Sequence, residues 1–259
     1  MKQPSLLLID AGNSSVKWAT VSQDRPTRIG SQPFGELLAR LSELDEFDLM
    51  LCSSVLSEDA NASLEFHARR LGANCWFAQT DKQLGGLSNS YADSSAMGVD
   101  RWLAMLGAWH RFRSSLCVID AGTALTIDFV DEQGCHQGGY IVPGAYLMRQ
   151  SLFANTDRVR SAVEQVTSLD PGTSTADAVG RGVLLAQVGA IRCALEQTEL
   201  ANVRVCTTGG NSEQLAGFAH LDQCHIENLV LEGLIVAAAH HELIDDGAAA
   251  LDKVQKSEF

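Results

Sequence analysis

Short apolar runs alternate with longer amphipathic segments along this chain of 259 residues, a pattern typical of α/β proteins. Two stretches, residues 6–20 and 116–129, follow nearly the same plan. In each, an apolar run predicts a buried strand and ends in an aspartate, Asp10 or Asp120. A glycine two residues later permits a tight turn, and a second run rich in β-branched or aromatic residues predicts a returning strand. We therefore expect two similar halves, each opening with a strand–turn–strand unit.

The other periodic segments predict the remaining elements of these halves. Further strands are expected over residues 27–34, 48–55, 75–78, 127–130, 138–143 and 203–207. Helices are expected over residues 35–44, 57–71, 98–112, 146–155, 176–198 and 228–241, with Ser57 as an N-cap. Residues 80–97 have no clear period and are expected to form a loop long enough to suggest a functional role.

The domain organisation follows from the spacing of the repeat. No low-complexity linker interrupts the chain, so the two halves are expected to pack closely with a cleft between them. We expect an α/β protein with an N-terminal domain over residues 1–113 and a C-terminal domain over residues 114–245. The polar, alanine-rich residues 246–259 are expected to form a flexible tail.

Charge and composition narrow the classes of function. The net charge of −13 argues against nucleic-acid or membrane surfaces as partners, because both require basic patches. No apolar run approaches the roughly 18 residues of a membrane span, and the first residues lack a signal-peptide pattern, so a cytoplasmic protein is expected. Seven cysteines without a C-x-x-C pair indicate reduced thiols rather than a disulfide framework.

The two Asp-x-Gly turns are candidates for phosphate binding. They lack the Walker A spacing and the G-x-G-x-x-G of dinucleotide-binding turns. Each instead combines a carboxylate with the backbone N–H groups of a turn, which suits a phosphate and its metal ion. A simple strand turn capped by aspartate, with Lys17 solvated, is the alternative. The recurrence of the turn favours the phosphate interpretation.

A wider set of motifs resembles one family within the superfamily of acetate kinase, sugar kinases, heat-shock chaperones and actin. Besides the two turns, residues 91, 98–101, 138–144, 175, 182 and 208–211 match type III pantothenate kinases in the family's order. Ser14 stands where the family more often has threonine, which keeps the hydroxyl group. A proline common in the family between residues 91 and 98 is absent, which affects the expected shape of that loop.

The resemblance implies two ribonuclease H-like (actin-like ATPase) domains and an activity. The family transfers the γ-phosphoryl group of ATP to pantothenate, the first step of coenzyme A biosynthesis, as a homodimer that requires Mg²⁺ and K⁺ or NH₄⁺. Asp100 would be the general base. The substrate contacts would be Tyr91, Gly98, Val99, Asp100, Arg101 and Thr175. The ATP and phosphate contacts would be Asp10, Ala11, Gly12, Asn13, Ser14, Ser15, Val16, Lys17, Thr123, Gly209 and Gly210. Asp10 would hold Mg²⁺ through the phosphates, and Asp120 would bind the monovalent cation.

Simpler roles are open for several of these residues. Asp100 could be a helix N-cap and Arg101 half of a surface ion pair. Tyr91 could be a packing residue, Thr175 a helix cap, and Gly209 with Gly210 an ordinary turn.

Two other functions are also open. One is a catalytically inactive regulatory or binding relative of the family, although Asp10, Asp100 and Asp120 are all present. The other is a superfamily kinase acting on another small hydroxyl or carboxyl substrate, such as a sugar or acetate.

Overall fold

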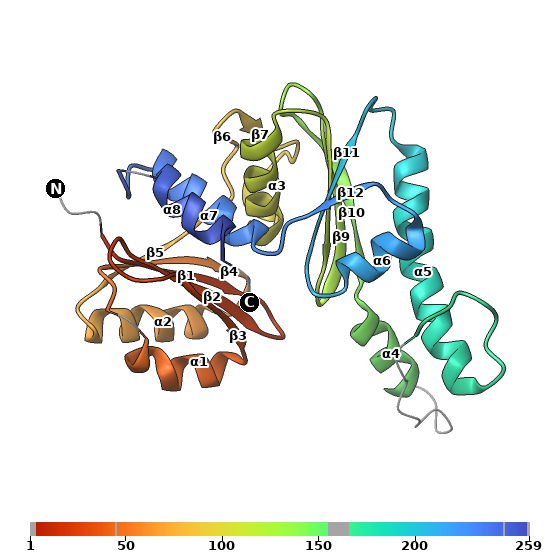
Figure 1. Ribbon diagram of the computed structural model, residues 1–259, viewed down its shortest axis with the longest axis horizontal. Helices are drawn as coiled ribbons and strands as arrows, with labels where there is room; N and C mark the ends of the chain where they lie inside the picture. Colours follow the sequence, from red (N-terminus) through yellow and green to blue (C-terminus); the bar gives the residue numbers. More distant parts are fainter. Residues whose placement is uncertain (1–3, 45, 155–165, 246, 258–259) are drawn as a thin grey trace. The chain divides into compact units, whose positions relative to one another are not determined.

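Two five-stranded sheets with the same strand order form the framework of the molecule (Figure 1). The computed structural model describes residues 4–44, 46–154, 166–245 and 247–257. The chain divides into two compact units, the first made of residues 1–113, 132–136 and 228–259 and the second of residues 114–131 and 137–227. In each sheet an antiparallel three-stranded meander continues into two parallel strands. The expected α/β architecture of two ribonuclease H-like halves is confirmed.

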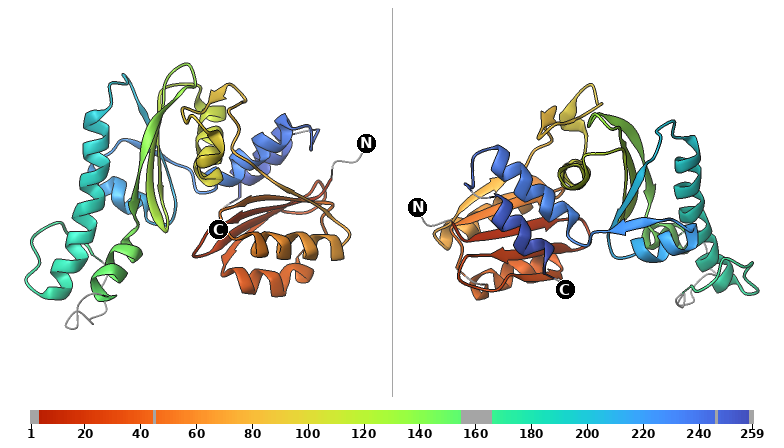
Figure 2. Two further views of the ribbon diagram at one scale, coloured as in Figure 1. Left: turned by 180° about the vertical axis from the view of Figure 1, so that it is seen from behind. Right: turned by 45° about the horizontal axis from the view of Figure 1, so that its top comes forward.

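The sheet of the first unit has the order β3-β2-β1-β4-β5. Its strands are β1 (Leu6–Ala11), β2 (Val16–Val21), β3 (Arg28–Gln32), β4 (Leu49–Ser54) and β5 (Asn74–Phe77). On one face lie α1 (Phe34–Arg40), a 3₁₀ turn (Leu41–Glu43) and α2 (Glu58–Arg70), as Figures 1 and 2 show. Ser57 caps α2 as expected, because its hydroxyl accepts the Ala60 N–H at 3.4 Å.

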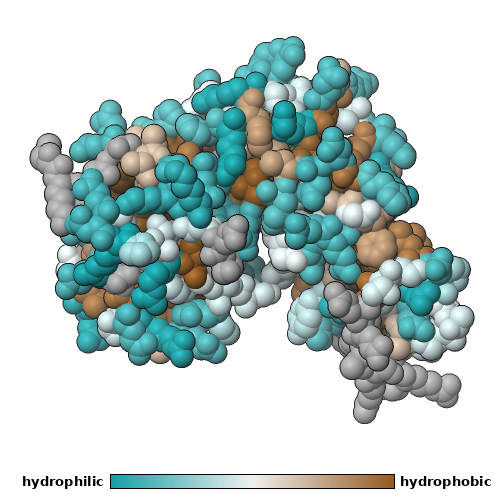
Figure 3. Space-filling view, in the orientation of Figure 1, coloured by the Kyte–Doolittle hydropathy of each residue, from teal (hydrophilic) through white to brown (hydrophobic). Residues whose placement is uncertain are grey.

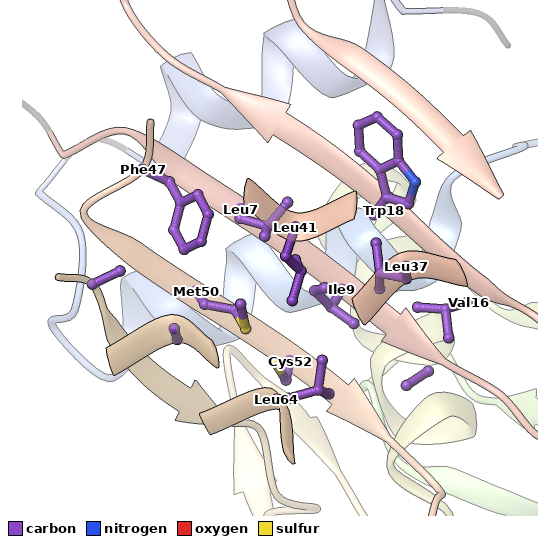
Figure 4. Packing of buried hydrophobic residues seen from close by; sticks show 13 residues of the cluster. Leu7, Ile9, Val16, Trp18, Leu37, Leu41, Phe47, Met50, Cys52 and Leu64 are labelled. Atoms are coloured by element: carbon purple, nitrogen blue, oxygen red, sulfur yellow. The ribbon is translucent and has the colours of Figure 1, made fainter. Parts of the chain in front are cut away.

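Alternate residues of the central strands decide which face of this sheet meets α1 and α2. Leu7 and Ile9 of β1 and Met50 and Cys52 of β4 pack with Leu64 of α2 in one buried cluster (Figure 4). Because side chains alternate along a strand, the residues between them point to the opposite face. Asp10 is one of these, so it lies on the face away from α1 and α2.

The opposite face is covered by α3 (Val99–Phe112), α7 (Leu229–His240) and α8 (Gly247–Gln255). Gly107 and Gly233 let α3 and α7 approach closely, because a Cβ on Gly107 would lie 2.8 Å from the Leu229 carbonyl oxygen. A buried ion pair adds to this contact, with Arg111 Nε and Nη2 each 2.6 Å from a carboxylate oxygen of Glu232.

The expected flexible tail over residues 246–259 is wrong for the residues that the structure describes there. Residues 247–255 form α8, whose apolar side chains Ala250, Leu251 and Val254 are buried against the first unit. Their spacing places them on one side of a helix, a side that α7 covers. Residues 246, 258 and 259 lie outside the described ranges. Residues 228–245, assigned from the sequence to the second half, also group with the first unit.

The second unit repeats the sheet as β10-β9-β8-β11-β12. Its strands are β8 (Leu116–Ala121), β9 (Ala124–Val130), β10 (His136–Pro143), β11 (Arg204–Thr208) and β12 (Gln223–His225). Its helices are α4 (Ala145–Ala154), α5 (Thr175–Gln197) and α6 (Ser212–Ala219). The strand β12 and the helix α6 are absent from the sequence prediction. Buried residues of α5 and α6, including Leu184, Val188 and Leu215, pack on β8 and β9.

The helix α5 is also, by length and composition, the one helix of the described chain that could cross a membrane. No such segment was expected from the sequence, in which no apolar run approaches the length of a membrane span. A core helix meets the same criteria, and one side of α5 belongs to the core of its unit. Hydrophobic side chains gather on the surface over α5 in the space-filling view (Figure 3), and Leu185 of this helix is exposed.

The loop expected over residues 80–97 contains a small hairpin and a 3₁₀ turn. The hairpin pairs β6 (Gln83–Leu84) with β7 (Leu87–Ser88), and the 3₁₀ turn spans Ser94–Ala96. Gly85 and Gly86 connect the two strands with φ values of +56° and +82°, which glycine adopts without strain. The glycine pair is therefore a turn signal that the sequence analysis did not use.

Candidate active site

The first Asp-x-Gly turn joins β1 to β2 and presents opposite charges on one face of the sheet. Asp10 and Lys17 are direct cross-strand partners, so their side chains lie side by side on the face away from α1 and α2. The Gly12 N–H donates to the Ser15 carbonyl oxygen at 3.2 Å and closes the turn, whose residues 13–15 are exposed. The turn therefore offers an accessible backbone beside a carboxylate and an ammonium group.

A buried hydroxyl group lies next to this carboxylate. Ser53 of β4 pairs with Asp10 in parallel register and is fully buried. Its Oγ has no hydrogen-bond partner among the residues that the structure describes. Sequence reasoning missed Ser53, because its only signal is its position at the end of a buried strand.

The second turn joins β8 to β9 and is crowded by two glycines from elsewhere in its unit. Gly209 has φ +87°, and a Cβ there would lie 2.5 Å from Asp120 Oδ1. The Gly144 N–H donates to the Thr123 carbonyl oxygen at 2.9 Å. The Gly122 N–H donates to the Ala124 carbonyl oxygen at 3.0 Å, which closes the turn. The motifs at residues 120–123, 144 and 209 thus converge on one place in the fold.

A third cluster forms where α3 begins. The Arg101 guanidinium donates from Nη1 to the Tyr91 hydroxyl at 3.0 Å and lies over the Tyr91 ring, 5.9 Å from its centroid. Arg101 is 6% exposed, so the alternative of a surface ion pair does not describe it. Asp100 in the first turn of α3 accepts the Arg101 N–H at 2.8 Å. The N-cap position belongs to Gly98, where a Cβ would lie 2.6 Å from Asp100 Oδ1.

The remaining predicted residues are placed as follows. Val99 is buried at the start of α3. Thr175 is the exposed first residue of α5, and the capping hydroxyl there is that of Ser174, which accepts the Asp177 N–H at 3.1 Å. Gly210 follows Gly209 after β11, and a Cβ on it would meet no atom within 4 Å. Within the first unit the structure unites Tyr91 with Arg101 and Asp100, and within the second it unites Asp120 with Thr123 and Gly209.

The residues present fit a metal that is held mainly by phosphates and water. No group of three or more histidine, cysteine, aspartate or glutamate side chains within the described ranges could hold a metal by itself. Mg²⁺ in phosphotransfer sites typically uses one or two carboxylates and keeps several water ligands. Asp10, beside the buried hydroxyl of Ser53, and Asp120, next to Gly209, each supply one such carboxylate.

The fold and the turns together define a class of protein. Solved structures with this fold include a Baf family protein from Campylobacter jejuni, with TM-score 0.61, 21% identity and coverage of 92% of this chain and 99% of that chain. Another is a protein from Sinorhizobium meliloti described as a 2-dehydro-3-deoxygalactonokinase, with TM-score 0.53, 14% identity and coverage of 90% and 98%. With its duplicated sheets and paired Asp-x-Gly turns, the chain is a member of the actin-like ATPase and sugar kinase fold.

Sequence comparison narrows this class to one family. The family model for type III pantothenate kinase matches residues 6–197. The type III pantothenate kinase of Marinobacter nauticus is 39% identical over 88% of this chain and 96% of its own length. That of Hahella chejuensis is 36% identical over 89% of this chain and 95% of its own length. The chain belongs to the type III pantothenate kinase family.

Proposed function

We infer that this chain transfers the γ-phosphoryl group of ATP to the primary hydroxyl group of pantothenate, the first step of coenzyme A biosynthesis. Family membership supports the reaction. For the residues that perform it, the main support is the cluster of Tyr91, Arg101 and Asp100 at the start of α3. Tyr91 lies in the loop after β7 and Arg101 in α3, and the two meet through a direct hydrogen bond, next to a carboxylate.

Asp100 is the proposed general base. An alcohol attacks a phosphoryl group well only when a positioned acceptor takes its proton, and a carboxylate is the usual acceptor in kinases. The hydrogen bond from the Arg101 N–H orients one carboxylate oxygen of Asp100. Gly98 supports this arrangement, because any side chain there would collide with the carboxylate.

Arg101 and Tyr91 are the proposed contacts for the pantothenate carboxylate and its neighbouring atoms. A guanidinium group binds a carboxylate through two parallel hydrogen bonds, and burial strengthens that interaction. Gly98 and Val99 would contribute backbone contacts beside them, and Thr175 would contribute its exposed hydroxyl.

The two turns are the proposed phosphate and cation sites. Residues Asp10 to Lys17 would hold the phosphates, with Asp10 oriented toward Mg²⁺, which shields phosphate charge when bound. Asp120 would hold K⁺ or NH₄⁺, while Thr123, Gly209 and Gly210 would contact the nucleotide. The close approach of Gly209 to Asp120 supports a shared role for the two motifs.

Two further proposals rest on the family alone. The enzyme is proposed to act as a homodimer and to work in the cytoplasm, where ATP and pantothenate are available. The net charge of −13 supports a role without nucleic-acid or membrane partners.

The test is an assay of purified protein with ATP, Mg²⁺, K⁺ and pantothenate, with 4′-phosphopantothenate measured directly. Asp100→Asn should lower kcat by about 10²-fold or more, the usual contribution of a general base. Asp59→Asn is the matched control, because Asp59 also lies in the first turn of a helix, α2, and should leave kcat unchanged.

Three results would contradict these assignments. Full activity of the Asp100→Asn variant would remove Asp100 from the mechanism. Thermal stabilisation by a sugar or acetate, but not by pantothenate, would identify a kinase for another substrate. The absence of any product together with retained pantothenate binding would favour the inactive regulatory relative.

A further inference from the structure

The loop that carries Tyr91 is held by a short segment that follows β9. Residues 132–136 group with the first unit, although β9 and the rest of β10 belong to the second. The Ser88 N–H donates to the Gly134 carbonyl oxygen at 2.9 Å, and Ser88 forms a parallel bridge with Cys135. The segment therefore runs alongside residues 88–91 and brings His136 close to Tyr91.

His136 makes two side-chain contacts with this loop. Its Nδ1 lies 2.9 Å from the Ser90 hydroxyl group, and its ring lies 6.1 Å from the Tyr91 ring, centroid to centroid, at an interplanar angle of 37°. His136 is only 3% exposed. A buried histidine with a hydrogen bond to one residue and a ring contact with the next restricts the orientation of both.

The hydrogen bonds of Tyr91 hold its backbone and its hydroxyl group, but they do not fix the orientation of its ring plane. That orientation depends on neighbouring side chains such as His136. Two hydrogen bonds hold the Tyr91 backbone. The Tyr91 N–H donates to Asn89 Oδ1 at 2.9 Å, and Lys82 Nζ donates to the Tyr91 carbonyl oxygen at 2.7 Å. Its hydroxyl group is fixed by Arg101. The Arg101 guanidinium and the His136 imidazole are thus the two planar groups recorded next to the Tyr91 ring.

We propose that His136 is a positioning residue for pantothenate binding, which acts by holding Tyr91 and, through the Tyr91 hydroxyl, Arg101. This inference rests on the proposed function, in which Tyr91 and Arg101 contact pantothenate. His136 itself need not touch the substrate. Its loss frees the Tyr91 ring to rotate, so part of the binding free energy is used to order the ring again.

The expected effect is specific to one substrate. Aromatic pairs and hydrogen bonds of this kind change an equilibrium by about threefold to tenfold each. His136→Ala should therefore raise the KM and Kd for pantothenate about tenfold, while kcat and the KM for ATP stay within about twofold. A histidine that served only the core would lower stability without this selective loss of pantothenate affinity.

Three further variants separate the two contacts and provide a control. His136→Phe keeps the ring beside Tyr91 and should recover most of the pantothenate affinity. Ser90→Ala removes only the hydrogen bond from an exposed residue, should fold normally, and should raise the KM about threefold. His67→Ala is the matched control. His67 has an Nδ1 contact with the Ser63 carbonyl oxygen at 2.8 Å and an aromatic neighbour, Phe66, at 5.7 Å, and its loss should not affect either substrate.

The measurements are steady-state kinetics for both substrates, titration calorimetry with pantothenate, and urea unfolding of every variant. The inference is overturned if His136→Ala and Ser90→Ala both keep the wild-type affinity for pantothenate, or if His136→Phe is as defective as His136→Ala. Equal losses for ATP and pantothenate would also overturn it. A wild-type protein that neither binds nor phosphorylates pantothenate would refute the proposed function and this inference with it. An active wild type with unchanged variants would refute the inference alone.

Discussion

The ion pair between α3 and α7 allows a quantitative prediction about stability. Glu232 is 1% exposed and accepts two hydrogen bonds of 2.6 Å from Arg111 and a third from Gln255 of α8 at 3.2 Å. Arg111→Met removes two of the three and leaves a buried carboxylate without its charge partner. Breaking a buried pair in this way costs about 3–5 kcal/mol of unfolding free energy.

Two related variants should lose less unfolding free energy than Arg111→Met. Glu232→Gln keeps a hydrogen-bonding side chain in place and leaves the charge on Arg111, whose side chain is 27% exposed and can be hydrated. We expect a loss of about 1–2 kcal/mol, the cost of weakened hydrogen bonds. The double variant Arg111→Met with Glu232→Met leaves no buried charge at this contact, so it should be more stable than Arg111→Met alone.

Tryptophan fluorescence during urea unfolding is a suitable assay, because all four tryptophans lie in the unit that contains the pair: Trp18, Trp76, Trp102 and Trp109. The unfolding free energy falls by about 2 kcal/mol for each molar of urea, so a loss of about 4 kcal/mol of unfolding free energy lowers the urea midpoint by about 2 M. Arg69→Met is the control. Arg69 and Glu65 also approach to 2.6 Å, but they are 73% and 43% exposed, and such exposed pairs contribute at most about 1 kcal/mol.

Two results would refute this reasoning. The first is a loss for Arg111→Met no larger than that for Arg69→Met, which would mean that Glu232 finds water or another partner. The second is a double variant less stable than Arg111→Met, which would mean that side-chain packing, rather than the unpaired charge, causes the loss.

Three further predictions concern single sites. Gly209→Ala should raise the KM for ATP at least tenfold and leave the KM for pantothenate unchanged, because its Cβ would lie 2.5 Å from Asp120 Oδ1; unchanged ATP kinetics would contradict this. The pKa of the Cys75 thiol is lowered by a hydrogen bond from the buried Cys52 thiol, 4.0 Å away between sulfur atoms, whereas burial raises the pKa of Cys52 itself. Alkylation of Cys75 by iodoacetamide, followed by mass spectrometry, should therefore begin at lower pH than alkylation of an ordinary thiol. The Cys52→Ala substitution should move the onset of Cys75 alkylation to higher pH. An onset that Cys52→Ala leaves unchanged would contradict this. Ser57→Ala should lower the unfolding free energy by about 0.5–1 kcal/mol in the same urea assay, since it removes the cap of α2, and an unchanged midpoint would show that the bond of 3.4 Å contributes little.

The local elements were predictable because their signals are local. Apolar runs that end in Asp10 and Asp120 predicted β1 and β8, and their partners β2 and β9 followed from the turns between them. The Ser57 cap predicted the start of α2 for the same reason, since the cap and the helix are adjacent in sequence. The likeness of the two halves was also visible in the chain, and the equal strand orders of the two sheets confirm it.

The expected flexible tail at the C-terminus was wrong because the helix there depends on packing against another element of the fold. Residues 247–255 contain three alanines but only two larger apolar side chains, Leu251 and Val254, so the stretch was interpreted from the sequence as a polar, alanine-rich tail. Those side chains are buried only when the helix packs against another apolar element. The much more apolar helix α7 is that element. The grouping of α7 and α8 with the first unit depends on the same packing.

The sequence alone determined the family, the fold class and the two turns, because backbone geometry and phosphate chemistry both require particular residues at short spacing. Only the tertiary structure decided which distant residues support those turns and contacts. Gly209 reaches Asp120 because β11 pairs with β8, and His136 reaches Tyr91 because residues 134–136 run beside residues 88–91. Such contacts join residues that are about 45 to 90 positions apart, and no local pattern of hydrophobicity or turn chemistry encodes them.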